Sequence, residues 1–135
     1  MKNKKAYLTV ILLLMILGFL YYPLWVVGKT KEKIDTSFLE GNYLEALQVS
    51  ESQLSETYST YTSTMIGELW GFTPRFFFLS VTGICQYQLR EYEEAVSTLT
   101  QAITYAEKNS YDTSHIEKTK ELLKKAKVKL PKQNK

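Results

Sequence analysis

The chain has 135 residues and a formal net charge of +3, a length that fits one small domain with an appendage and excludes a second sizeable core. Its only cysteine, Cys85, excludes an internal disulfide and a cysteine-based zinc site. The charge is uneven, since residues 34–117 carry 12 acids and 3 bases, whereas residues 118–135 carry 8 lysines and 1 acid. The acidic body argues against nucleic-acid binding.

The first predicted element is a membrane anchor. Residues 6–27 are 22 consecutive uncharged and mainly apolar residues, and a helix of that length reaches about 33 Å, enough to cross a hydrocarbon core of about 30 Å. We interpret this run as an uncleaved transmembrane signal anchor. A cleaved signal peptide is the alternative, although the run exceeds the roughly 7–15 apolar residues usual there. Pro23 falls in the last turns of the run, where a proline can end or kink the helix.

Lysines flank the predicted anchor on both sides. The segments 1–5 and 28–33 each contain three of them, so the positive-inside count is nearly a tie. A very short basic N-terminus usually stays in the cytoplasm, so we predict that residues 1–5 are cytoplasmic. The predicted location is a bacterial inner membrane, with a single span and the C-terminal domain in the periplasm. A cytoplasm-facing domain is the alternative.

A helical domain is predicted over residues 34–130, after a linker at 28–33. Residues 34–39 form a short first helix, residues 40–42 (Glu-Gly-Asn) a tight turn, and the helix that follows from Tyr43 has an apolar face that Ser50 weakens.

The segment 55–73 sets aromatic residues among serines and threonines. One interpretation is an extended helix and a loop whose aromatic side chains pack on the neighbouring hairpin. The other is a recognition surface, because Tyr and Trp offer large rigid contacts with hydrogen-bonding tips. The candidate partner-binding residues are Tyr58, Tyr61, Trp70, Phe72, Arg75 and Gln86.

A second hairpin and a final helix follow. Thr73 and Pro74 predict a helix start, and the helix at 75–89 is apolar nearly all round, which indicates burial on more than one side. Residues 92–106 place apolar side chains on one face, and the short connection makes the two helices antiparallel neighbours.

A lysine-rich helix is predicted at 113–130, ended by Pro131, with residues 131–135 as a disordered basic tail. This basic end is either a solvated final helix or an electrostatic contact for anionic lipid or an acidic partner. The predicted fold class is therefore all-α, with a transmembrane helix before a small helical domain.

Two sequence segments carry a family resemblance. Residues 38–47 (FLEGNYLEAL) and 87–96 (YQLREYEEAV) both resemble the turn of a tetratricopeptide repeat, in which a tyrosine stands three positions before a small alanine. Gly83 falls where that family's first helix has a close-packing glycine, and Leu99 and Ala102 fall on its large and small positions.

The resemblance also has departures. Ala46 and Ala95 are 49 positions apart instead of about 34, and Gln53 replaces a small alanine. The resemblance implies about two diverged repeats with a C-terminal capping helix. It also implies ligands along the concave face, where Arg75 and Gln86 are the polar candidates.

The sequence contains little catalytic chemistry. His115 is the only histidine, Cys85 lies in the most apolar predicted helix of the domain, and no phosphate-binding glycine loop or HExxH spacing occurs. We therefore expect no enzyme activity and no cofactor. The predicted function is a membrane-tethered scaffold or assembly factor that holds a membrane-associated protein partner, with self-association open. The alternative is a permanent small accessory subunit of a larger membrane enzyme, transport or secretion complex.

Overall fold

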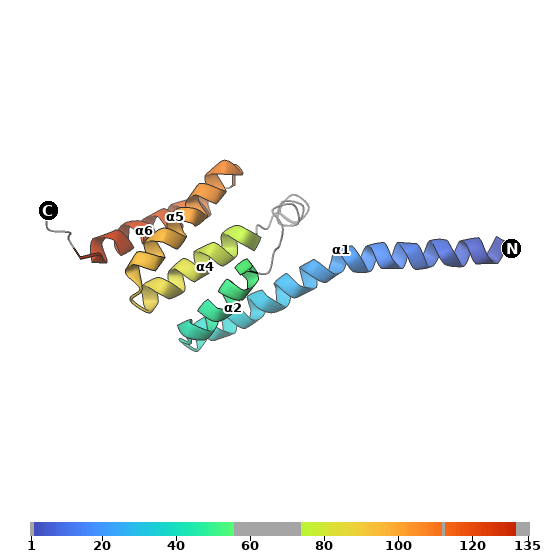
Figure 1. The fold of residues 1–135 in the computed structure, drawn as a ribbon, viewed down its shortest axis with the longest axis horizontal. Coiled ribbons are helices and arrows are strands. Elements are labelled where there is room, and N and C mark those ends of the chain that lie inside the picture. Colours follow the sequence, from blue (N-terminus) through green and yellow to red (C-terminus); the bar gives the residue numbers. More distant parts are fainter. Residues whose placement is uncertain (1, 56–73, 112, 132–135) are drawn as a thin grey trace. The chain divides into compact units, whose positions relative to one another are not determined.

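The computed structural model describes residues 2–55, 74–111 and 113–131. Every regular element among them is an α-helix, as Figure 1 shows: α1 (Lys2–Leu39), α2 (Tyr43–Ser55), α4 (Pro74–Gln88), α5 (Tyr92–Lys108) and α6 (Thr113–Lys129). The predicted all-α class is confirmed for this part of the chain. The chain divides into two compact units, Met1–Glu32 and Lys33–Lys135, which are described in turn.

The first unit is the larger part of α1. Its large apolar side chains from Tyr7 to Tyr22 expose between 46% (Leu20) and 83% (Phe19) of their surface, whereas Val27 exposes 4%. The rings of Tyr22 and Trp25 stack with their centroids 6.4 Å apart. This helix is long and apolar enough to cross a membrane, a property that N-terminal signal sequences share.

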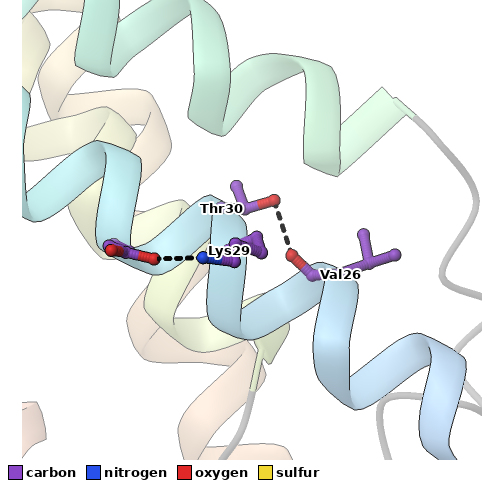
Figure 2. A network of polar contacts seen from close by, with 4 residues as sticks. Val26, Lys29 and Thr30 are labelled. Carbon is purple, nitrogen blue, oxygen red and sulfur yellow. Dashed lines mark hydrogen bonds and ion pairs between the residues drawn. The ribbon is translucent and has the colours of Figure 1, made fainter.

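α1 does not end at Pro23 but continues to Leu39. The helix also includes residues 28–33, which were expected as a linker. Figure 2 shows local contacts that support it there: Thr30 Oγ1 donates to the carbonyl oxygen of Val26 at 2.9 Å, and Lys29 Nζ pairs with Glu32 Oε2 at 2.9 Å. Lysine and glutamate are good helix formers, and pairs one turn apart stabilise a helix.

In the second unit, consecutive helices are spatial neighbours. α2 packs on α4, α4 on α5, and α5 on α6, and α4 also approaches α6. One core cluster joins the end of α1, α2 and α4 through Ile34, Ala46, Leu47, Phe78, Val81 and Cys85. A second cluster joins α5 and α6 through Ile103, Ala106 and Ile116. Packing of apolar faces therefore holds the unit together.

α4 and α5 approach closely at Gly83. A Cβ atom placed on this glycine would lie 2.5 Å from Leu99 Cδ2, a distance at which the leucine would have to move. Leu99 is fully buried and has little room to do so. The close packing expected at Gly83 is therefore confirmed.

The turn between α1 and α2 is a helix C-terminal Schellman motif. The backbone N–H of Asn42 donates to the carbonyl of Ser37 at 2.8 Å, and that of Gly41 donates to Phe38 at 3.1 Å. Gly41 has a φ of 71°, which glycine adopts without a steric penalty. The predicted turn at 40–42 is confirmed.

The turn between α4 and α5 repeats this pattern. The N–H of Glu91 donates to the carbonyl of Gln86 at 2.8 Å, and that of Arg90 donates to Tyr87 at 3.1 Å. Arg90 occupies the left-handed position with a φ of 67°. Each of these residues lies 49 positions after its counterpart in the first turn, so the two turns are copies in hydrogen bonding and backbone shape.

The aromatic contacts beside the turns are repeated as well. Phe38 and Tyr43 meet edge to face with centroids 5.5 Å apart, and Tyr87 and Tyr92 do so at 5.6 Å. These pairs are again 49 positions apart. We call residues 34–55 and 83–104 the first and second hairpin copies.

Ser50, which weakens the predicted apolar face of α2, is fully buried. Its hydroxyl donates to the carbonyl of Leu47 and lies 2.9 Å from Thr82 Oγ1. Thr82 is in turn 2.8 Å from the carbonyl of Phe78. Hydrogen bonding of both hydroxyls removes the penalty of burying them.

Candidate functional site

The six residues predicted to bind a partner fall into two groups. Tyr58, Tyr61, Trp70 and Phe72 lie outside the described residues. Arg75 and Gln86 both lie on α4, 11 positions apart, which is about 16 Å along a helix. The structure therefore does not bring these two side chains together.

Arg75 lies near the start of α4, which begins at Pro74 as predicted. Its guanidinium carbon is 5.6 Å from the centre of the Tyr105 ring. Tyr111 lies 5.9 Å from Tyr105 and 6.5 Å from Phe76, measured between ring centroids. This Arg75 cluster joins α4, α5 and the α5–α6 turn.

The Arg75 cluster holds a fixed positive charge beside an unused polar atom. A guanidinium over an aromatic ring is attracted by the negative face of the ring. The hydroxyl of Tyr105 is buried and has no hydrogen-bond partner among the described residues. Sequence reasoning found Arg75 but missed Tyr105 and Tyr111, because nothing local in the sequence joins the end of α5 to the start of α4.

Gln86 exposes 7% of its surface, so its side chain lies within the packed part of the domain. Its Oε1 has no hydrogen-bond partner in the part of the chain that the structure describes. The residue next to it in sequence, Tyr87, borders an open hollow instead.

This hollow has a volume of about 400 Å³ and lies between the end of α4 and the C-terminal half of α6. We call it the lysine hollow. Its lining residues are Tyr87, Glu121, Lys124, Lys125, Val128 and Lys129. Val128 is 78% exposed, so an apolar side chain stands among ammonium groups. The charge run in the sequence indicated a basic end, but nothing in it placed Tyr87 there.

The charge of the lysine hollow is positive. Lys125 Nζ pairs with Glu121 Oε1 at 2.8 Å. The hydrogen bond raises the pKa of Lys125 and lowers the pKa of Glu121. No carboxylate of the described residues forms an ion pair with Lys124 or Lys129. Two ammonium groups are therefore left uncompensated around an apolar surface.

Cys85 is fully buried in the first core cluster. Burial raises the pKa of its thiol to about 11, with a smaller contribution from Glu51. At neutral pH the thiol is protonated, and a protonated thiol is a poor nucleophile.

Within the described ranges, no three His, Cys, Asp or Glu side chains gather as a metal site requires. The side chain of His115 lies outside them.

Similarity to known proteins gives no further guide. The chain matches no protein family, no curated protein and no solved structure.

Proposed function

We propose that this protein is a membrane-tethered scaffold or assembly factor, whose two hairpin copies form a tetratricopeptide-like domain that holds a protein partner. The observation that carries the proposal is an edge-to-face ring pair beside a Schellman turn, which recurs at an interval of 49 residues. The α5–α6 turn has Schellman hydrogen bonds as well, so the ring pair and not the turn alone marks the repetition. Repeated hairpins stack side by side into extended surfaces, and such surfaces serve mainly to bind other chains.

The tether in this proposal is the apolar part of α1. Exposed apolar surface costs about 25 cal/mol per Å² in water, and nearly every side chain from Tyr7 to Trp25 is exposed. A bilayer removes that cost. We propose a bacterial inner membrane with the domain in the periplasm, because a very short basic N-terminus favours the cytoplasmic side.

The partner surface that we propose combines the segment 55–73 with Arg75. Arg75 follows that segment in the chain with only Pro74 between them, and its stacking on Tyr105 limits the motion of its charge. A charge fixed in this way loses little side-chain entropy when it pairs with a carboxylate of a partner.

The experiment is purification of the full-length, tagged chain in mild detergent, with identification of bound proteins by mass spectrometry. We expect one or a few stoichiometric membrane partners. The double variant Trp70→Ala/Tyr61→Ala and the single variant Arg75→Ala should each reduce capture at least tenfold at unchanged helicity. Arg90→Ala, which removes an exposed arginine from the α4–α5 turn, is the matched control.

A protein that purifies without companions would contradict the scaffold. Full capture by the Trp70/Tyr61 variant would reject the segment 55–73 as the contact surface and leave the scaffold standing.

The second candidate is a permanent small subunit of a larger membrane complex. It is favoured by Leu39 and Leu44, which flank the first turn and expose 90% and 55% of their surfaces. Apolar side chains of this kind often lie in obligate interfaces. A permanent subunit should be degraded when made without its complex, whereas a scaffold should persist as a folded chain. Pulse-chase measurement of its half-life separates the two.

A further inference from the structure

We propose that the lysine hollow docks on an anionic lipid surface, so that the domain lies against the membrane to which α1 tethers it. This inference rests on the membrane anchor of the proposed function and goes beyond it. Partner capture does not require it.

The first argument is the arrangement of α6. Its buried residues, Ile116, Thr119 and Ala126, face the rest of the domain. Lys124 and Lys129 lie on its exposed surface without an ion pair among the described residues. Each basic side chain near a negatively charged membrane raises the ratio of bound to free protein about fivefold.

The second argument is the apolar content of the same surface. Val128, at 78% exposure, and the ring of Tyr87 both line the hollow. A headgroup region accepts a small apolar side chain and the aliphatic stems of lysines while their charges remain near phosphate. Phosphodiester headgroups thus match both the charge and the chemistry of the hollow.

The third argument is proximity. An anchored domain meets the lipid surface at a high effective concentration, so even a weak contact is populated. The chain also has a large charge asymmetry. The lysine-rich end, residues 118–135, has a net charge of +7, and the acidic body, residues 34–117, has a net charge of −9. An anionic surface attracts the first and repels the second, which orients the domain.

Exposed acids on α5 distinguish lipid from a second copy of this chain. Glu93 and Glu94 lie in the first turn of α5 and are exposed. Lipid phosphates repel them, so neutralising them strengthens docking on lipid. If a second copy bound the lysines through these carboxylates, neutralising them would instead weaken the association of the two copies.

The test uses the full-length chain in nanodiscs, made either of phosphatidylcholine or with roughly a quarter phosphatidylglycerol. Val128→Cys carries an environment-sensitive nitrobenzoxadiazole fluorophore. Cys85 is buried and reacts slowly, and the chain with native Val128 gives its background labelling. We expect a blue shift in anionic discs only, and its loss near 1 M salt, where the screening length falls to about 3 Å.

Charge variants locate the contact. Lys124→Gln/Lys129→Gln should lower the ratio of docked to free domain about thirtyfold. Lys108→Gln/Lys118→Gln removes the same charge from exposed sites outside the hollow and should change the ratio less than fivefold. Glu93→Gln/Glu94→Gln should raise the ratio.

Identical spectra in neutral and anionic discs would overturn the proposal. So would a shift that grows with protein concentration in detergent and falls in the Glu93/Glu94 variant, since that result assigns the hollow to a second copy. Co-elution of the chain with both kinds of disc checks the anchor independently, so a failed anchor and a failed docking contact give different results.

Discussion

The two hairpin copies share the hydrogen bonds and the left-handed backbone position of their turns but differ in the residues that form them. At the left-handed position of the turn, the first copy has Gly41 and the second has Arg90, with φ angles of 71° and 67°. Glycine adopts this conformation freely, whereas an arginine is strained there by about 1–2 kcal/mol. The same turn therefore forms with and without the favoured residue, because the packing on either side imposes it.

The two copies also differ in the size of the residues at two matching positions, one on each helix of the hairpin. In the second copy, Gly83 on the first helix meets Leu99 on the second. At the corresponding positions the first copy has Ile34 and Ser50, which are 1% and 0% exposed. The large residue of the pair therefore lies on the second helix in the second copy and on the first helix in the first copy, and all three side chains are buried.

The largest expected loss of stability comes from shortening Leu99, the large buried residue of the second copy. Leu99→Ala should lower the free energy of unfolding by about 2–5 kcal/mol through lost burial and a cavity. Gly83→Ala should cost about 1–3 kcal/mol, because its Cβ collides with Leu99. Urea unfolding of the full-length chain in detergent, followed by circular dichroism, measures both.

The double variant Gly83→Ala/Leu99→Ala sharpens this test. The shortened side chain leaves room for the new Cβ, so the combined loss should be smaller than the sum of the two single losses. Strict additivity would show that the two residues do not share one packing site.

The next effect concerns the polar contact of the first copy. Thr82→Val should destabilise the domain by about 1–3 kcal/mol, since it leaves the buried Ser50 hydroxyl without one of its neighbours. Replacing both hydroxyls, in Ser50→Ala/Thr82→Val, should cost less than the sum of the single changes. Thr100→Val is the matched control, because its hydroxyl bonds the Val96 carbonyl at an exposed site. An equal loss at Thr100 would mean that burial is irrelevant.

The two turns should respond in opposite directions. Gly41→Ala should destabilise by about 1 kcal/mol, because alanine is strained at positive φ. Arg90→Gly should stabilise by about 0.5 kcal/mol, the strain relieved being partly offset by the flexibility of glycine in the unfolded chain. The melting temperatures of both variants test this expectation. If the melting temperature falls in both variants, Arg90 is not strained in its left-handed conformation.

The smallest effect is expected at the exposed pair of Lys125 and Glu121. Lys125 lowers the pKa of Glu121, so the pair stabilises the folded state above the ordinary carboxyl value of 4.5 and loses this contribution as pH falls through the lowered pKa. Glu121→Gln should therefore reduce the melting temperature slightly at pH 7 and not at about pH 2. A difference that persists in acid would point to packing instead of charge.

Local chemistry explains what could be predicted from the sequence. Gly41 and Pro74 mark a helix end and a helix start by their own backbone constraints, and the spacing of apolar residues in α5 identifies its buried face. The continuation of α1 through residues 28–33, which were expected as a linker, was not predicted, because their mixture of lysines and polar residues lacks an apolar face.

The rest depends on contacts between residues far apart in the chain. Ser50 and Thr82 are separated by 32 positions, and Tyr87 meets α6 across the hollow more than 30 positions away. Each residue alone appears ordinary. The position of Gln86 also depends on such contacts. It was expected on a binding face by analogy with repeat hairpins, but its side chain is buried.

The burial of Cys85 has a practical consequence for measuring the stability of this fold in reconstituted lipid. The thiol belongs to the cluster that joins α1, α2 and α4, so a water-soluble alkylating reagent reaches it only when that cluster opens. The labelling rate, compared with that of an unstructured thiol, then gives the opening equilibrium directly. The native sequence therefore already contains a probe of local opening of the domain. This probe works in an intact bilayer, where a denaturant would disturb the lipid as much as the fold.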